Sequence, residues 1–219
     1  MFLTRCDINP ARRGAQKLLG SPQAMHATVL AAFPESLDET RGRVLWRVDT
    51  DQHHVRCYIV SHDRPDLTHL IEQAGWPTTQ TWETREYGRL LSSLTPGQRW
   101  GFRLHANPTR STRIGAASRS QRVGHVTADQ QLGWFLERAA KWGIEVPEVD
   151  GAPAVRVRSR GTDTFRRENA RVTLATATYE GLLDVSQPDL LARALTQGIG
   201  PAKAYGCGLL TLAPVPVPS

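Results

Sequence analysis

Two kinds of hydrophobic pattern alternate along the first 94 residues. Stretches in which apolar and polar residues alternate, or in which β-formers cluster, predict strands at residues 2–8, 43–49, 54–60 and 82–87. Apolar residues at helical spacing predict two helices, at residues 21–33 and 65–74. A proline stands near the start of each helix, and Pro34 or Gly75 closes it. The predicted order is strand, helix, strand, strand, helix, strand.

The second half repeats this order after a break at Thr95-Pro96-Gly97. The hydrophobic pattern predicts strands at residues 99–105, 155–160, 171–185 and 209–213. One helix begins at Thr127 with a capping-box pattern and stops at Gly143, and another surrounds Leu190. The expected fold class is therefore α+β, with two tandem ferredoxin-like (RRM-like) βαββαβ domains, residues 1–94 and 95–219.

Composition adds a basic character that is unevenly distributed. The chain has 27 Lys and Arg against 21 Asp and Glu, a net charge of +6, and its hydrophobic content of 40% excludes a disordered protein. From Tyr87 to Ala128 there is no acidic residue, whereas arginine recurs throughout. A tract of one charge sign that is dominated by arginine is typical of a polyphosphate-binding surface. For residues 108–124, a solvated loop is the alternative.

A second arginine group lies further along the chain. Arg156, Arg158 and Arg160 fall at every second position, so a strand would place all three on one face. Without interleaved acids they repel one another and gain from a polyanion, although a solvated sheet face is the alternative. The candidate nucleic-acid contacts of the two groups are Arg110, Arg113, Arg119, Arg122, Arg156, Arg158, Arg160, Arg166 and Arg167.

A glycine-rich stretch, residues 198–208, lies between the last predicted helix and the last strand. It holds four glycines, Lys203 and no acidic residue. Glycine lets backbone N–H groups approach an anion, so Gly198, Gly200, Gly206, Gly208 and Lys203 are candidate phosphate contacts. The order of elements excludes a P-loop and a dinucleotide fingerprint, both of which need a helix after the glycines. The alternative is that the glycines end a helix and shape a tight turn.

His26 is a candidate for proton transfer, because histidine titrates near neutral pH. It lies one position from the apolar face of its predicted helix, and Gln23 lies three residues earlier on the same side. The other histidines have no spacing typical of a zinc or iron site, and no close carboxylate pair suggests a magnesium-dependent nuclease. We therefore expect no metal and no other cofactor.

The cysteines, the N-terminal residues and the length of the apolar runs indicate the cellular compartment. The three cysteines, Cys6, Cys57 and Cys207, form no CxxC pair and indicate buried thiols in a reducing environment. The N-terminal residues lack the layout of a signal peptide, and no apolar run approaches the ~20 residues that span a bilayer. We expect a cytoplasmic protein.

Several stretches together resemble a known family. Residues 198–213, Gly-Ile-Gly-Pro-Ala-Lys-Ala-Tyr-Gly-Cys-Gly-Leu-Leu-Thr-Leu-Ala, closely resemble the C-terminal signature of the CasE endoribonucleases, which process CRISPR precursor RNA in type I-E systems. The resemblance extends to residues 179–183, to residues 106–108, and to His26 followed by Phe33-Pro34. It touches both halves of the chain, and its specific part is the glycine-rich stretch.

The resemblance implies a fold, an activity and partners. Members of this family have two tandem ferredoxin-like domains, bind the hairpin of each CRISPR repeat and cut at the base of its stem without a metal. The 2′-hydroxyl of the RNA attacks the phosphate, which leaves a 2′,3′-cyclic phosphate and a 5′-hydroxyl. The protein then stays on the mature crRNA with the other subunits of the type I-E Cascade complex.

The resemblance also implies roles for individual residues, with one departure from the pattern. His26 would be catalytic, and Lys203 with the glycine-rich stretch would stabilise charge on the phosphate. Gln23 stands where the family carries a tyrosine, and an amide is not the proton donor that a phenol is. The alternatives are a non-catalytic RNA-binding subunit of a ribonucleoprotein and a domain pair that binds a small metabolite.

Overall fold

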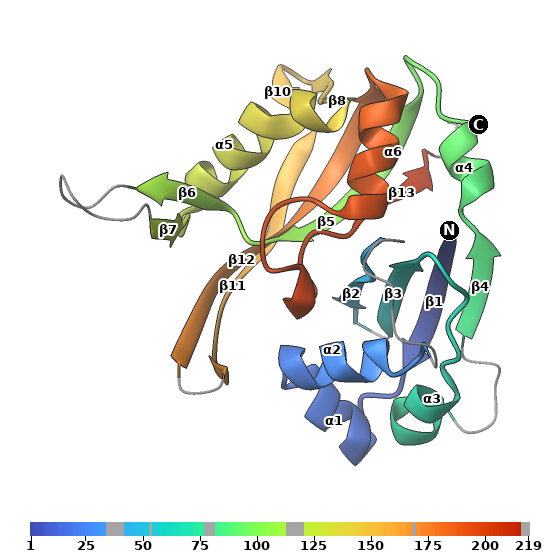
Figure 1. Ribbon diagram of the computed structural model, residues 1–219. Coiled ribbons are helices and arrows are strands. Elements are labelled where there is room, and N and C mark those ends of the chain that lie inside the picture. The colour runs from blue at the N-terminus through green and yellow to red at the C-terminus, as the bar shows by residue number, and fades with distance from the viewer. Residues whose placement is uncertain (34–41, 53, 77–81, 113–120, 168–169, 216–219) are drawn as a thin grey trace. The chain divides into compact units, whose positions relative to one another are not determined.

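The computed structural model describes residues 1–33, 42–52, 54–76, 82–112, 121–167 and 170–215 (Figure 1). The chain divides into two compact units. The first comprises Met1–Ser93, Thr196–Gly198 and Lys203–Leu209; the second comprises Leu94–Leu195, Ile199–Ala202 and Leu210–Ser219. Part of the glycine-rich stretch thus packs with the first unit, although it follows the last helix of the second.

The first unit has the predicted element order with two additional short helices. Its elements are β1 (Phe2–Ile8), α1 (Arg13–Leu19), α2 (Pro22–Leu30), β2 (Leu45–Thr50), β3 (Val55–Ser61), α3 (Thr68–Ala74), β4 (Trp82–Glu86) and α4 (Gly88–Ser92). The strands form one antiparallel sheet in the order β2-β3-β1-β4. The sequence pattern did not predict α1 and α4, because each spans at most seven residues and shows too little periodicity.

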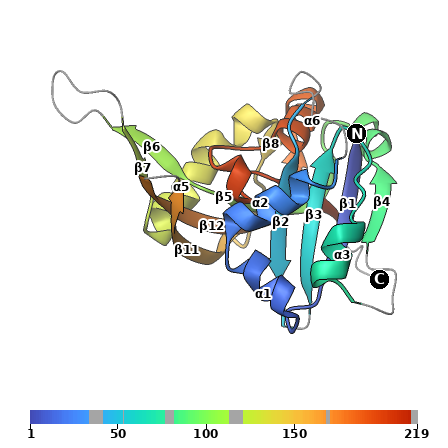
Figure 2. The same ribbon diagram turned by 60° about the horizontal axis from the view of Figure 1, so that its bottom comes forward.

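Helices α1, α2 and α3 cover one face of this sheet, as Figures 1 and 2 show. Apolar side chains from both layers form a continuous core, including Ile8, Met25, Val29, Cys57 and Ile59. This follows from the alternation along the strands, which sends every second side chain towards the helices. All three cysteines are buried free thiols, as predicted, and burial is the main reason that the pKa of Cys6 rises to about 12.

The second unit repeats the sheet and adds hairpins to it. Its elements are β5 (Arg99–Ala106), β6 (Thr109–Thr112), β7 (Gln121–Gly124), α5 (Ala128–Ala139), the 3-10 turn η2 (Ala140–Trp142), β8 (Ile144–Glu145), β9 (Glu148–Val149), β10 (Ala152–Pro153), β11 (Val155–Arg167), β12 (Ala170–Val185), α6 (Pro188–Gln197) and β13 (Leu210–Pro214). The main sheet has the order β11-β12-β5-β13, with β8 on β12; β6 pairs with β7 and β9 with β10. Strand for strand, this is the order of the first unit.

Helices α5 and α6 lie against one face of this second sheet (Figure 1). Phe135 of α5 stacks on Phe102 with ring centroids 5.2 Å apart, and the buried Tyr179 donates a hydrogen bond of 2.9 Å to the carbonyl of Gln131. Thr127 caps α5 by accepting from the N–H of Gln130, and Gly143 adopts a left-handed conformation after the η2 turn, as the sequence predicted. Both units are ferredoxin-like, which confirms the predicted fold class.

Two features of the structure differ from what the sequence pattern indicates. Apolar neighbours in the sequence predict core positions for Trp46, Trp76, Trp100, Trp134 and Trp142; this holds for Trp46 and Trp134, but Trp76 is 44% exposed. The pairing of β6 with β7 was not predicted, because its residues lie in the arginine-rich tract, which has no apolar alternation. No helix in the described part of the chain is long and apolar enough to cross a membrane.

Candidate active site and nucleic-acid interface

Helix α2 positions His26 at the boundary of the first unit's core. Ser21 caps the helix by accepting a hydrogen bond of 3.2 Å from the N–H of Ala24, and Pro22 occupies the first helical position. Met25 and Val29 are buried on the apolar face of α2, whereas His26 is partly buried. The sequence prediction of a boundary position is therefore confirmed.

Trp46 of β2 holds the His26 ring in place. Its indole Nε1–H donates a hydrogen bond of 3.2 Å to Nδ1 of His26, and the two rings stack with centroids 6.5 Å apart and planes 23° from parallel. Burial, and to a smaller extent the charge of Arg43, lower the pKa of His26 below its usual value of 6.5. The ring is therefore mainly neutral at pH 7.

The glycine-rich stretch is a turn built on left-handed backbone conformations. Gly198, Gly200, Gly206 and Gly208 have φ values of +75°, +73°, +79° and +92°, which other residues rarely adopt. Gly206 lies against Trp46, since an added Cβ would stand 2.8 Å from the indole ring. Gly206 and Gly208 are buried within the chain. Their conformations fit the turn-forming interpretation and bring the turn against the tryptophan that binds His26.

Lys203 begins the 3-10 turn η3 (Lys203–Tyr205), which packs on α2 and on β2. The end of the glycine-rich stretch is held by Arg47, whose guanidinium donates to the carbonyl of Leu209 at 2.8 Å and pairs with Asp49 at 2.7 Å. Arg47 is 1% exposed and lies 5.4 Å from the ring centroid of Tyr58. Strand β2 therefore contacts the stretch through two successive residues, Trp46 and Arg47.

Gln23 lies on α2 three residues before His26 and is exposed.

The sequence reasoning missed Trp46 and Arg47 as site residues. The apolar neighbours of Trp46 indicated only a core residue. Nothing in the sequence around Arg47 marks it as buried, apart from Asp49 two positions later. The fold therefore brings His26, Trp46 and the turn that carries Lys203 together within one unit.

The arginine triplet of β11 does not share one face. A bulge shifts the register between Val157 and Ser159. Arg156 therefore pairs with Glu180 and Arg160 with Ala177, two positions of β12 whose side chains point to opposite faces of the sheet because they are an odd number of residues apart. Arg156 and Arg160 therefore point to opposite faces, which makes the sequence prediction of a common face wrong. The guanidinium of Arg160 donates to the carbonyl of Val126 at 3.1 Å.

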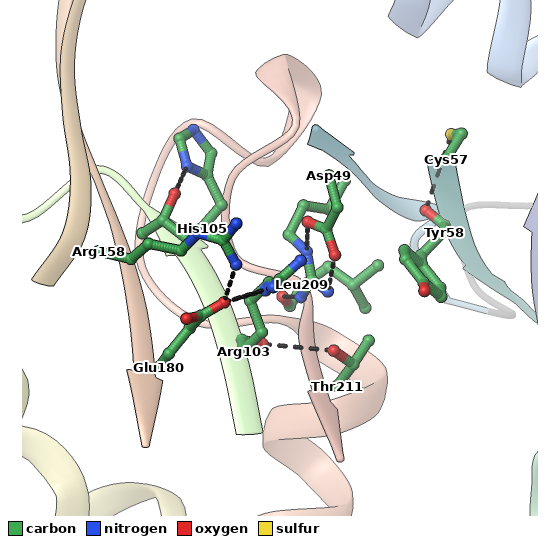
Figure 3. A network of polar contacts seen from close by, with 11 residues as sticks. Asp49, Cys57, Tyr58, Arg103, His105, Arg158, Glu180, Leu209 and Thr211 are labelled. Carbon is green, nitrogen blue, oxygen red and sulfur yellow. Dashed lines mark hydrogen bonds and ion pairs between the residues drawn. The ribbon is translucent and has the colours of Figure 1, made fainter. Parts of the chain in front are cut away.

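Glu180 gathers the neighbouring arginines on the face of the second sheet away from its helices. Arg158 binds its carboxylate at 2.7 Å, Arg156 approaches it to 3.5 Å, and Arg103 forms a further ion pair with it, as Figure 3 shows for Arg158 and Arg103. Burial opposes ionisation, but hydrogen bonds and charge from Arg158 and Arg103 lower the pKa of Glu180. No acid stands between these arginines in the sequence, but Glu180 on the neighbouring strand pairs with Arg156 and Arg158 and so offsets the repulsion that the sequence pattern indicates.

The remaining predicted arginines lie near hairpins or outside the described residues. Arg110 is exposed on β6. The backbone of Arg122 lies in β7, and that of Arg166 and Arg167 at the end of β11, but their side chains are outside what the structure describes, as are Arg113 and Arg119 altogether. Among the described residues, no cluster of His, Cys, Asp and Glu could hold a metal ion.

Comparisons with known proteins agree over nearly the whole length. The family described as CRISPR associated protein matches residues 1–214. The chain is 31% identical over 225 residues to the CRISPR-associated endoribonuclease Cse3 of Thermus thermophilus, in an alignment that covers 98% of this chain and 100% of the relative. It is also 31% identical over 121 residues to the Cascade subunit CasE of Escherichia coli, covering 52% and 57% of the two chains.

A solved structure agrees with these sequence matches. Thermus thermophilus Cse3 bound to an RNA representing a pre-cleavage complex superposes with a TM-score of 0.78 at 31% identity, covering 97% of this chain and 98% of that one. The ferredoxin-like fold, the glycine-rich turn and the position of His26 agree with the same family. The chain belongs to the CRISPR associated protein family.

Proposed function

We propose that this protein is a metal-independent endoribonuclease that binds CRISPR repeat hairpins and cleaves precursor RNA to guide RNA. The observation that carries this proposal is the match, over almost the entire length of both chains, to an endoribonuclease whose solved structure holds RNA as a pre-cleavage complex. The site of His26, Trp46 and the glycine-rich turn supplies chemistry that fits it.

The nucleophile that we propose is the RNA's own 2′-hydroxyl. It is held beside the scissile phosphate, so its attack is intramolecular and forms a 2′,3′-cyclic phosphate while the 5′-oxygen leaves. His26 is the group that acts at the phosphate, and Lys203 with the N–H groups of its turn stabilises the growing negative charge. Gln23 is exposed on α2 three residues before His26, so in this proposal it contacts the same RNA segment, but its amide is not a proton donor of the phenol kind.

The second unit supplies the RNA-binding charge in this proposal. The side chains of Arg103, Arg156, Arg158 and Glu180 carry a net charge of +2 on one sheet face, which suits a phosphate backbone. The proposal divides the chain into residues 1–94, the domain with the catalytic histidine, and residues 95–219, the domain with the arginine-rich segment. The glycine-rich stretch follows in the sequence of the second domain, but most of it packs with the first unit. The partners are the crRNA and the other Cascade subunits, and the compartment is the cytoplasm.

The test uses a labelled repeat hairpin incubated with the protein in EDTA. We expect one cut at the base of the stem, with a 2′,3′-cyclic phosphate and a 5′-hydroxyl as product ends. A matched RNA with a single 2′-deoxy sugar just upstream of the cut should bind with equal affinity and stay intact. Cleavage of the deoxy RNA would exclude internal attack, and loss of cleavage in EDTA would show a metal requirement.

The same assay distinguishes the second candidate, a non-catalytic RNA-binding subunit. Gln23 favours this alternative, because the resemblance to the CasE family implies a tyrosine where this chain has an amide. A hairpin that binds tightly but remains uncut at all protein concentrations would support it. Restoration of cutting by Gln23→Tyr would then identify the amide as the cause.

A further inference from the structure

The start of β2 brings two positively charged side chains into the region of His26. One is Lys203: an added Cβ at Gly198 would stand 3.0 Å from Cε of Lys203 and 2.8 Å from the side chain of Leu45, so both lie against this glycine. The other is Arg43, two residues before Leu45. The turn that begins at Lys203 also contacts α2, and all these residues belong to the first unit.

Arg43 is linked to His26 through Trp46. Arg43 precedes Trp46 by three residues, so their Cα atoms lie at most about 11 Å apart, and the indole of Trp46 donates its hydrogen bond to the His26 ring. The charge of Arg43 also acts on the histidine, because after burial it is the cause that lowers the pKa of His26. A charge shifts a pKa in this way at short range. The guanidinium and the imidazole therefore belong to one cluster.

Arg43 differs from most arginines of the first unit, which have partners inside the chain. Carboxylates, backbone carbonyls at the end of α3 or an aromatic ring engage Arg5, Arg12, Arg47, Arg56, Arg64, Arg85 and Arg89. Arg43 is exposed, and no described residue forms a hydrogen bond or an ion pair with it. A guanidinium binds a phosphate group through two parallel hydrogen bonds. Arg43 is thus available to an anion beside His26.

We propose that Arg43 is a catalytic residue that binds the non-bridging oxygens of the scissile phosphate on which His26 acts. This role rests on the proposed function. The 2′-oxygen forms a bond to phosphorus while the bond from phosphorus to the 5′-oxygen breaks, and negative charge grows on the phosphate oxygens. The 2′-hydroxyl loses a proton and the 5′-oxygen gains one; His26 carries out one of these transfers and water the other. Arg43 exchanges no proton and offsets the growing charge.

The same contact couples the state of His26 to the presence of RNA. In the free protein the charge of Arg43 favours the neutral ring. A phosphate bound to Arg43 offsets this charge, so the pKa of His26 should rise when the RNA binds, and the ring can then exchange a proton near neutral pH. The other charged or titratable groups on β2 and on the elements that contact α2 are Arg13, Lys17, Arg47, Asp49, Lys203 and Tyr205.

Titration of the His26 ring by nuclear magnetic resonance tests the contact. In the free protein, Arg43→Gln should raise the pKa of His26 towards 6.5, whereas the matched control Arg13→Gln, which removes an exposed arginine of α1, should leave it unchanged. The ring signals are assigned by their loss in His26→Ala. The uncleavable 2′-deoxy hairpin should raise the pKa more in the wild type than in Arg43→Gln. Equal rises in these two proteins would overturn the proposal.

Kinetics with the repeat hairpin supply the second readout. Arg43→Gln should lower the single-turnover cleavage rate about 10²–10³-fold, as expected for one lost group that stabilises the transition-state charge. It should also reduce the slope of log affinity against log salt by up to about one unit. Arg43→Lys keeps the charge but not the forked geometry, so it should recover part of the rate. Arg13→Gln should keep the wild-type rate.

The outcomes separate this proposal from the proposed function. A wild-type rate in Arg43→Gln would remove Arg43 from the mechanism. A wild-type protein that cuts no hairpin would refute the proposed function. In that case the titration and the salt slope with the 2′-deoxy hairpin still decide whether Arg43 binds a phosphate beside His26, because neither measurement requires cleavage.

Discussion

The two units share a strand order but carry different chemistry. In the first, the site lies between α2, β2 and the glycine-rich turn, and its central pair, His26 and Trp46, is neutral and partly or wholly buried. In the second, the polar cluster around Glu180 lies on the sheet face opposite to the one that Tyr179 presents to α5, and it is highly charged.

The difference shows what each kind of site requires from the same fold. A histidine ring that is held in one orientation needs partial burial and one fixed partner, which the helix-covered side of the first sheet supplies. The surface that we propose for phosphate binding needs guanidinium groups near water, which the other face of the second sheet supplies, and Glu180 reduces their mutual repulsion. Substitutions that alter one of these regions and leave the other intact therefore test the contrast.

The largest effect is expected from His26→Ala. Loss of the group that we propose to act at the phosphate should lower the cleavage rate by about 10²–10⁴-fold, while hairpin affinity in a gel shift stays within about two-fold of the wild type. His62→Ala is the matched control, because His62 is exposed in the same unit and its ring pairs only with Asp63 among the described residues. Cutting by His26→Ala at the wild-type rate would remove the histidine from the mechanism.

The next effect is expected from Gly206→Ala, which disturbs the first site through packing. The substitution combines a positive φ, which costs an L-residue about 1–2 kcal/mol, with a Cβ 2.8 Å from Trp46. Overpacking adds a destabilisation of about 1–3 kcal/mol, so the free energy of unfolding measured in denaturant and the cleavage rate should both fall. Gly97→Ala is the control, since its φ of +82° is similar and an added Cβ meets no atom within 4 Å. Equal losses in the two variants would mean that contact with Trp46 has no role.

The third prediction concerns the second unit and uses the bulge in β11. Arg156→Gln with Arg158→Gln should reduce the slope of log affinity against log salt by up to about two units, roughly one for each phosphate contact. Arg160→Gln tests the opposite face of the sheet. It should reduce the same slope by at most about one unit, and this reduction should add to that of the double variant. An unchanged slope in the double variant would show that Glu180 already satisfies both arginines.

The smallest effect is expected from Glu180→Gln and depends on pH. The pKa of Glu180 is lowered in the folded chain, so its ionised form stabilises the fold above the ordinary value of 4.5, and this stabilisation is lost as the pH falls through the lower, folded pKa. At pH 7 the wild type should be more stable by about 1 kcal/mol in denaturant unfolding, and the difference should shrink below pH 4.5. Parallel stability curves for the two proteins across that range would contradict this assignment.

The sequence by itself determined the element order, the fold class and the family resemblance. Strand and helix periods are local properties, so alternation in residues 2–8 or the cap at Thr127 could be interpreted without knowledge of the rest of the chain. The glycines of residues 198–208 could also be interpreted locally as turn residues, because positive φ values favour glycine. His26 could be singled out by its residue type and its helix position, but not by any partner.

Only the tertiary structure decided which side chains meet. Trp46 lies 20 residues from His26, and Glu180 lies 77 residues from Arg103, distances over which no periodicity carries information. The bulge between Val157 and Ser159 is set by pairing with β12, and one residue out of register moves every following side chain to the other face. A local pattern specifies what each segment can form, whereas packing and register determine which nitrogen of His26 accepts a hydrogen bond and which arginines face the same way.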